Sequence, residues 1–351
     1  MSGEKLDYWS FFSVDARRTG SALYARLAEG VGNDVQLKEM AARAKPGQPH
    51  ANVLFGAVHF LLLHGTEHPL RAFYPDLNEG RIVEGDAFPA FREFCLSHEA
   101  ELDPLIRTRV TNTNEVGRSA VLHPGFRIAA ETAGAPLNLI EIGPSAGLNL
   151  IWDSYGINYM KDGASVASIA PHAKLVIDCE VKSEALPPTG QTPAVASRVG
   201  LELNPVDLAN PDDRDWLRAL MWPDQIPRLE RLERAIALFE TRRPEIRPGD
   251  ALDLLPDALA RIPAGEPVCV YHTIAVYQFS TAMKQALDDI LVTASLRRPV
   301  HRLSFEFDGT ECVLSLVAYR DGARSEEPLA ICHPHGIWID WRRGSMQASR
   351  P

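Results

Sequence analysis

Residues 137–156, "LNLIEIGPSAGLNLIWDSYG", constrain the fold of this chain more than any other stretch. An apolar run ends at Glu141, glycines follow at Gly143 and Gly147, and a second apolar run begins directly afterwards. A strand that ends in a glycine turn and leads into a helix leaves backbone N–H groups open to a ligand. The stretch therefore predicts a strand over 137–142, a helix over 145–154 and a cofactor-binding turn between them.

The rest of the chain after this turn alternates between short apolar runs and amphipathic ones. Further strands are expected over 198–203, 267–272 and 300–307. Helices are expected between them over 212–220, 227–240 and 278–296. This alternation indicates a parallel α/β sheet. Near the end, "HRLSFEF" and "CVLSLVAYR" flank "DGTE" and predict a hairpin, and "GIWIDW" is expected to form one more strand.

The chain before the turn has a different character. Apolar residues recur at helical spacing, helices are expected over 50–64, 86–100 and 118–133, and no strand-like alternation is visible. The sequence thus predicts an α-helical N-terminal domain or cap over 1–135 and an α/β domain over 136–351. An insertion is expected at about 156–197, where "KLVIDCEV" predicts a strand and "ALPPTGQTPA" predicts a loop.

Composition excludes several classes of function. The net charge of −10 argues against a protein that binds nucleic acid through a basic face. The longest apolar stretch, "VLFGAVHFLLLHG", is too short to span a bilayer, and the N-terminus has no apolar signal core. Five scattered cysteines indicate neither a disulfide framework nor a zinc knuckle. We therefore expect a cytoplasmic protein with no membrane or nucleic-acid partner and a small-molecule substrate, whose oligomeric state the sequence leaves open.

The spacing of the glycines narrows the choice of cofactor. Dinucleotide enzymes use G-x-G-x-x-G, whereas this turn reads Glu141-Ile-Gly143-Pro-Ser145-Ala-Gly147. It resembles motif I of the class I S-adenosylmethionine-dependent methyltransferases, E/D-x-G-x-G-x-G, with Ser145 in place of the middle glycine. The resemblance implies a Rossmann-like sheet with helices on both faces and S-adenosylmethionine as cofactor. It places Glu141 near the methionine end of the cofactor, and the turn from Gly143 to Gly147 under the methionine and ribose.

Two later stretches resemble further parts of the same family, in the same order. "RVGLELNPVDL" is similar to the second strand, which implies that Glu202 accepts hydrogen bonds from the ribose hydroxyls. "IRPGDALDLL" is similar to the third strand and its turn, which implies that Asp250 meets the adenine amino group and Ala251 packs on the ring. If "LVIDCEV" is the second strand instead, Asp178 or Glu180 takes the ribose role; we favour "VGLELNP" because it ends in a turn.

Four residues are candidates for catalysis or for closing over the substrate: His272, Asn114, Glu115 and Arg118. His272 follows the expected fourth strand and could act as a general base near neutral pH. The other three lie in "TNTNEVGRSAVLHPGF" and could instead cap helices and pair with one another. His333 and His335 have spacing that allows a shared metal, but the sequence fixes no third ligand, so no metal is predicted.

Five stretches resemble an uncharacterised bacterial family, a domain of unknown function assigned to the methyltransferase superfamily. They are "TNTNEVGRSAVLHPGF", "GPSAGLNL", "LMWPDQIPR", "VYHTIAVYQF" and "CHPHGIWIDW". The resemblance covers nearly the whole chain. It implies a methyltransferase acting on a small molecule, with the acceptor and the methylated atom left open. A non-catalytic protein of the same fold that binds the cofactor or a metabolite is the alternative, and the glycine spacing disfavours a nicotinamide oxidoreductase.

Overall fold

The computed structural model describes residues 7–343 and consists of two units, one of helices and one that combines a sheet with helices. One unit combines Met1–Thr113 with Val206–Glu230, and the other combines Asn114–Pro205 with Arg231–Pro351. The expected boundary at 135/136 therefore differs from the observed division. Helix α7 (Arg118–Ala133) belongs to the unit that holds the sheet, and the segment 206–230 belongs to the helical unit.

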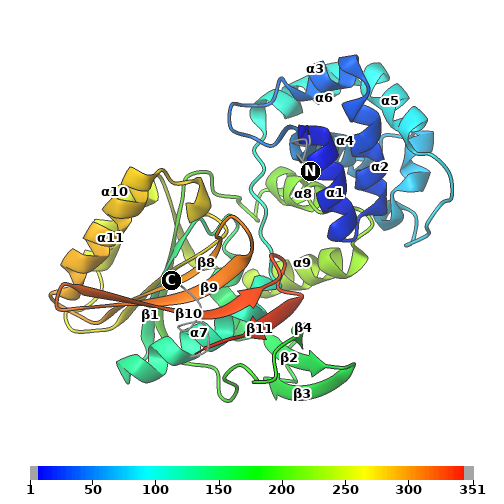
Figure 1. Cartoon of the computed structure of the whole chain (residues 1–351). Coiled ribbons are helices and arrows are strands. Elements are labelled where there is room, and N and C mark those ends of the chain that lie inside the picture. The colour runs from blue at the N-terminus through cyan, green and yellow to red at the C-terminus, as the bar shows by residue number, and fades with distance from the viewer. Residues whose placement is uncertain (1–6, 344–351) are drawn as a thin grey trace, which may run out of the picture. The chain divides into compact units, whose positions relative to one another are not determined.

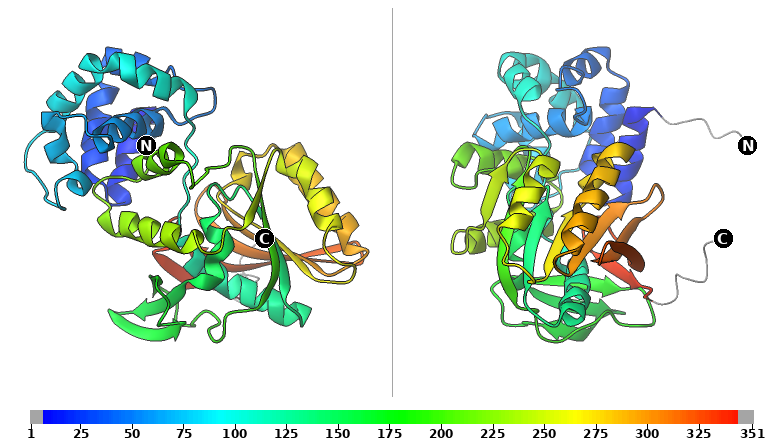
Figure 2. Two further views of the ribbon diagram at one scale, coloured as in Figure 1. Left: turned by 180° about the vertical axis from the view of Figure 1, so that it is seen from behind. Right: turned by 90° about the vertical axis from the view of Figure 1, so that its left-hand side faces the viewer.

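The described residues of the first unit form helices and no strands; the helices are coloured blue to cyan, with α8 in green, in Figures 1 and 2. Its elements are α1 (Tyr8–Arg18), α2 (Ala22–Gly32), α3 (Val35–Ala41), α4 (His50–Leu63), η1 (Pro69–Phe73), η2 (Pro75–Leu77), α5 (Phe88–Ser97), α6 (Glu99–Thr108) and α8 (Pro211–Ala219). Helix α4 is buried on nearly every side, because its sequence is apolar all round. The helices expected over 50–64, 86–100 and 118–133 are confirmed as α4, α5 and α7.

The second unit holds an eleven-stranded sheet with the order β3-β2-β4-β11-β10-β9-β8-β7-β1-β5-β6. Its strands are β1 (Leu137–Ile142), β2 (Gly156–Lys161), β3 (Ala164–Ile169), β4 (Val176–Val181), β5 (Val195–Glu202), β6 (Glu245–Pro248), β7 (Val268–Thr273), β8 (Val300–Phe307), β9 (Cys312–Arg320), β10 (Ala323–Cys332) and β11 (Trp338–Trp341). The prediction of a mixed α/β fold is confirmed, but the sheet is larger than expected.

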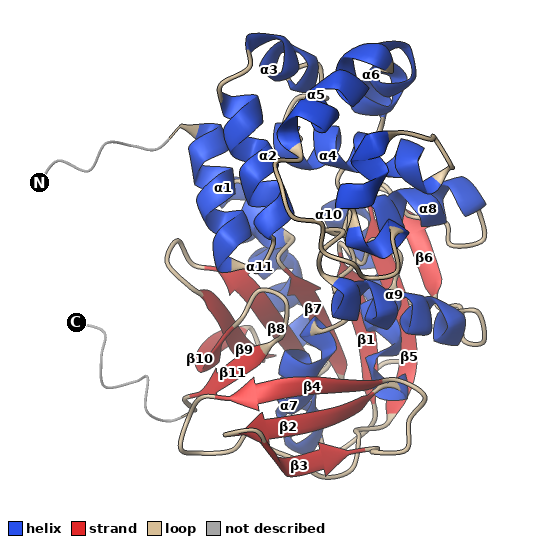
Figure 3. Cartoon of the chain, turned by 90° about the vertical axis from the view of Figure 1, so that its right-hand side faces the viewer, coloured by secondary structure: helices blue, strands red, loops and turns tan. Residues whose placement is uncertain are grey.

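Strand β1 lies inside the parallel half of this sheet. It pairs in parallel with β5 on one side and β7 on the other, and β6 and β8 extend the parallel order outwards. The hairpin of β8 and β9 is confirmed, with residues 308–311 in its turn. The expected insertion at 156–197 contains β2, β3 and β4, which form the far edge of the sheet (Figure 3).

Helices cover both faces of the sheet. Helix α7 packs on one face, and α10 (Ala251–Ala260) and α11 (Thr281–Ser295) pack on the other (Figure 1). Helix α9 (Ile226–Phe239) carries the chain across the division between the two units. Among residues 7–343, no helix has the length and apolar character to cross a membrane. All five cysteines are buried, as thiols that act as small hydrophobic side chains tend to be.

The helix expected over 145–154 is shorter than expected and of another type. The chain forms a 3₁₀ helix, η3 (Leu148–Ser154), with a kink at Ile151. Two side chains form hydrogen bonds with the backbone of its first residue. Asn114 Oδ1 accepts from the N–H of Leu148 at 2.8 Å, and the hydroxyl of Tyr155 donates to the Leu148 carbonyl at 2.7 Å. Because these partners fix the segment from outside, local helix propensity does not decide its geometry.

Candidate functional site

Glu141 stands at the carboxyl end of β1, on the face of the sheet that α7 covers. Its register neighbours are Gly200 in β5 and Tyr271 in β7. The Tyr271 hydroxyl lies 2.9 Å from Glu141 Oε2 and 3.1 Å from the carbonyl oxygen of Asn149. The ring of Phe126, from α7, packs edge-on against Tyr271. Strand register and an aromatic contact thus hold the Glu141 carboxyl group in one position.

The environment of Glu141 favours its neutral form. Burial, with a smaller contribution from the nearby carboxylate of Glu202, raises the pKa of Glu141 to about 8 against the opposing effects of Tyr271 and Arg118. The side chain is only 1% exposed, and Oε1 has no hydrogen-bond partner among the described residues. A buried carboxyl oxygen without a partner is the kind of group that a ligand satisfies.

Glu202 ends β5 and fastens the glycine turn to that strand. Its Oε2 accepts from the N–H of Ser145 at 2.8 Å, and its Oε1 accepts from the N–H of Asn204 at 3.0 Å. The side chain is buried. The structure also settles which strand lies beside β1: it is β5, whereas the "LVIDCEV" strand, β4, pairs with β2 and β11. The ribose role of Glu202 stays a prediction.

The glycine turn has the left-handed backbone that its sequence allows. Gly143, Ser145 and Gly147 have φ angles of 71°, 56° and 83°. A Cβ on Gly147 would lie 2.9 Å from Ile246 Cδ1, and one on Gly143 would lie 2.8 Å from Ala275 Cβ. The turn therefore needs glycine for both its conformation and its close packing.

The glycine turn was expected to leave its backbone N–H groups open to a ligand, and the structure differs from this expectation. Four of its N–H groups already have protein acceptors: those of Gly143, Ser145, Gly147 and Leu148. What the turn brings together instead is two buried carboxyl groups, Glu141 and Glu202. The electrostatic character of the site is acidic, which suits a cation better than a phosphate.

Asp250 and Ala251 follow β6, the strand next to β5. Asp250 is exposed and caps α10, with Oδ1 accepting from the N–H of Leu252 at 2.8 Å. Ala251 is buried at the start of the same helix. The three acids singled out in the sequence thus stand at the carboxyl ends of three adjacent strands, β1, β5 and β6. Their roles toward a cofactor stay predictions.

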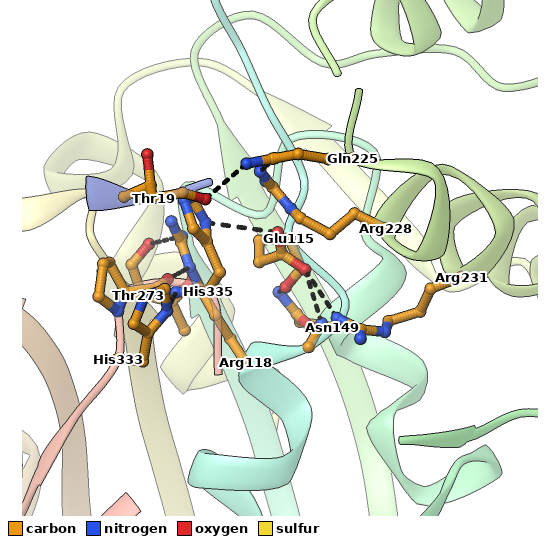
Figure 4. A network of polar contacts seen from close by, with 12 residues as sticks. Thr19, Glu115, Arg118, Asn149, Gln225, Arg228, Arg231, Thr273, His333 and His335 are labelled. Atoms are coloured by element: carbon orange, nitrogen blue, oxygen red, sulfur yellow. Dashed lines mark hydrogen bonds and ion pairs between the residues drawn. The ribbon is translucent and has the colours of Figure 1, made fainter. Parts of the chain in front are cut away.

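Asn114 and Glu115 connect the start of α7 with the turn and the neighbouring segments. Asn114 Oδ1 accepts from the N–H of Leu148, and the backbone carbonyl of Glu115 accepts from Asn149 Nδ2 at 3.3 Å. The buried Glu115 carboxylate lies 3.5 Å from Arg231 Nη1 and 3.4 Å from His335 Nδ1 (Figure 4). Both side chains lie on the same loop and position several parts of the sheet unit, so a positioning role fits their contacts.

Arg118 bridges the carboxyl end of β7 and the turn after β10. Its Nε donates to the carbonyl of Pro334, and its Nη1 donates to the carbonyl of Thr273, both at 2.9 Å (Figure 4). It is also close enough to Glu141 to favour the ionised carboxylate. The structure therefore gathers Asn114, Glu115 and Arg118 around the Glu141 end of the sheet.

His272 lies on the opposite face. It follows Tyr271 directly in β7, and consecutive strand residues point to opposite sides. Its register neighbour Ile142 belongs to the core under α10 and α11. His272 Nδ1 lies 2.6 Å from Glu306 Oε1. The structure does not bring the His272 ring onto the Glu141 face, and its role as a base stays a prediction.

Sequence reasoning missed Tyr271, Asn149, Thr273 and Glu306. Tyr271 and Thr273 lie in "VYHTIAVYQF", but only the register of β1 and β7 shows that Tyr271 meets Glu141. Glu306 is an acid between Phe305 and Phe307 near the end of β8, a signal that could have marked it. No three His, Cys, Asp or Glu side chains within 7–343 are placed to hold a metal ion.

Comparisons with known proteins give one family. No curated protein matches the chain. The model of a family described as an uncharacterized protein conserved in bacteria, DUF2332, matches residues 9–341. The match supports the bacterial family inferred from the sequence strings, and nothing in it links that family to methyltransferases. Since nearly all of the sequence is matched, the chain belongs to the DUF2332 family of bacterial proteins.

Proposed function

We propose that this protein is an S-adenosylmethionine-dependent methyltransferase whose cofactor lies at the carboxyl ends of β1, β5 and β6. One observation carries the proposal: Glu141 and Glu202, both buried, meet at a left-handed glycine turn, and Glu141 Oε1 lacks a hydrogen-bond partner among the described residues. A ligand with a positive charge and hydroxyl groups complements such a site.

The order of the strands supports this position. The parallel half of the sheet reads β6-β5-β1-β7-β8, so the chain proceeds from β1 to one side and then returns to the other. In open α/β sheets, ligands bind outside the carboxyl ends of the strands at such a reversal. Glu141 is the next-to-last residue of β1, the strand at which the order reverses.

The acidic character favours S-adenosylmethionine over a dinucleotide. The pyrophosphate of NAD would approach two carboxyl groups and a turn whose N–H donors are largely occupied. S-adenosylmethionine carries a sulfonium and an ammonium group, and a cation beside Glu141 favours its ionised form. When bound, this cofactor supplies an electrophilic methyl group. The protein then has to orient the reactants and exclude water.

Each residue of the proposed site has a role that its environment allows. Glu141 meets the methionine end, while Gly143 and Gly147 allow close approach of the ligand. Each carboxylate oxygen of Glu202 accepts one hydrogen bond from a backbone N–H group, so each has a second lone pair that can accept from a ribose hydroxyl. Exposed Asp250 is available to the adenine amino group.

Equilibrium binding of S-adenosylhomocysteine to matched variants tests the site. Glu202→Gln removes a carboxylate acceptor, and Glu141→Gln removes a carboxyl group that a bound cation would ionise; each is expected to weaken binding about 10- to 100-fold. Asp178→Asn is the control, because Asp178 is an exposed acid of β4, remote in the strand order from β1. Circular dichroism checks that the variants fold. Wild-type protein that does not bind, or Glu variants that bind as tightly as Asp178→Asn, would overturn the proposal.

A further inference from the structure

A pocket of about 250 Å³ lies on the α11 side of the sheet near the carboxyl ends of β7 and β8. Polar and charged side chains dominate its lining: His272, Lys284, Asp288, Arg302, Ser304 and Glu306. It is separate from the Glu141 site because His272 and Tyr271 are consecutive in β7 and point to opposite faces. The proposed cofactor site makes no use of this pocket.

Glu306 fixes the orientation of His272 at this pocket. Its Oε1 lies 2.6 Å from His272 Nδ1 and accepts from the N–H groups of Ala275 and Val276 at 3.0 and 3.1 Å, while Oε2 accepts from the N–H of Tyr277 at 3.0 Å. Burial works to raise the pKa of Glu306, but these hydrogen bonds outweigh it and hold the pKa below its usual value. The ionised carboxylate therefore keeps a proton on Nδ1 of His272.

The other ring nitrogen of His272 is left for a ligand. The side chain is almost fully buried, it lines the pocket, and Nε2 has no hydrogen-bond partner in the described part of the chain. A carboxylate on one nitrogen and an unpartnered second nitrogen is the arrangement that orients a histidine for proton exchange or ligand binding.

The turn after β7 carries backbone strain. Ile274 has a φ of 51°, a left-handed conformation that a β-branched side chain rarely adopts. Its N–H donates to the carbonyl of Phe305 at 2.7 Å. The strained residue directly precedes the three N–H groups that bind Glu306. Strain of this kind persists where the surrounding structure holds a functional group in place.

The donor groups of Lys284 and Arg302 in the pocket are not all occupied by partners among the described residues. Asp288 is already neutralised by Arg302, whose Nη1 lies 2.9 Å away, and it also accepts from the Tyr319 hydroxyl. Glu306 has its four donors. By contrast, Lys284 is exposed and forms no ion pair within residues 7–343, and Arg302 Nε has no hydrogen-bond partner there. Apart from Nε2 of His272, the groups that are left to meet a ligand are donors.

We propose that this pocket binds a small molecule through a carboxylate or phosphate group, which contacts Lys284 and Arg302, with His272 Nε2 as the third polar contact. Nε2 accepts from a protonated oxygen of the ligand or, in the imidazolium form, donates to an anionic oxygen. Charge-assisted hydrogen bonds from lysine and arginine are well suited to both kinds of group.

Nuclear magnetic resonance of the histidine rings in the full-length protein tests the proposal. The His272 ring signals are identified by their loss in His272→Gln. Inorganic phosphate, acetate and neutral acetamide are titrated separately, so the first two distinguish a phosphate site from a carboxylate site. We expect phosphate or acetate to shift the His272 signals to saturation and acetamide to leave them unchanged.

A lysine variant supplies the matched comparison. Lys284→Gln should weaken anion binding about tenfold, since it removes one charge-assisted contact, whereas Lys174→Gln, at another exposed lysine of the same unit, should not. The proposal would be overturned by an absence of saturable shifts with both anions, by equal shifts with acetamide, or by unchanged affinity in Lys284→Gln. No cofactor enters this experiment, so its outcome is independent of the methyltransferase proposal.

Discussion

At the scale of single residues, the carboxyl group of Glu141 couples folding to pH. Its pKa is raised from an ordinary value of 4.5 to about 8, first by burial. Below pH 4.5, the folded and unfolded states both hold the proton. As pH rises, the unfolded chain ionises first, so the stability that the neutral carboxyl group contributes is lost up to about pH 8.

Glu141→Gln removes this titration and should therefore change how stability depends on pH. Relative to wild type, the variant should gain stability steadily between about pH 5 and pH 8, because a tenfold change in proton affinity is worth about 1.4 kcal/mol. Urea unfolding at pH 5, 7 and 9 measures the difference. A constant difference between the two proteins across this range would show that the Glu141 carboxyl group is not held neutral.

The residues that sequence reasoning found are those whose signal is local. Gly143 and Gly147 were visible because a left-handed turn needs glycine close in sequence to a strand end. Tyr271 was not, because its contact with Glu141 spans 130 residues. Glu306 lies 34 residues from His272 in the chain. Such partners follow only from the register of paired strands.

At the scale of secondary-structure elements, the glycine turn is expected to tolerate no side chain at Gly147. Gly147→Ala adds a left-handed conformational penalty and a close contact with Ile246. Gly163→Ala adds only the conformational penalty, because Gly163 has a left-handed φ of 78° but a Cβ there would meet no neighbouring atom. We expect about 1 kcal/mol of destabilisation for Gly163→Ala and about 1–3 kcal/mol more for Gly147→Ala. Denaturant unfolding measures both; equal losses would mean that the turn is loosely packed.

Elements were predicted well where burial is complete and poorly where it is not. Strand β1 is buried throughout and its bounds are those expected from its apolar run. Strands β2, β3 and β10 were not predicted; β3 is mostly exposed, and β10 begins with four exposed residues, so neither shows a clear apolar pattern. The helix expected over 145–154 is a 3₁₀ helix that begins at Leu148, where hydrogen bonds with the side chains of Asn114 and Tyr155 hold its first turn.

At the scale of the whole molecule, the two units are discontinuous in sequence. The segment 206–230 belongs to the helical unit, where Trp216 and Leu220 join the core of α4 and its neighbours. A helix was predicted over 212–220, but a helical pattern does not show which core the helix joins. The matched family model spans segments of both units.

The central claim is that the acid-lined turn of the sheet unit holds S-adenosylmethionine. Thermal unfolding with S-adenosylmethionine, S-adenosylhomocysteine and NAD in parallel tests it most directly, because a ligand of the native state stabilises it by about 2.7 kcal/mol at 100 times its Kd. The proposal predicts a higher Tm with each of the first two ligands and an unchanged Tm with NAD. No change with either of the first two, or a rise with NAD alone, would contradict it.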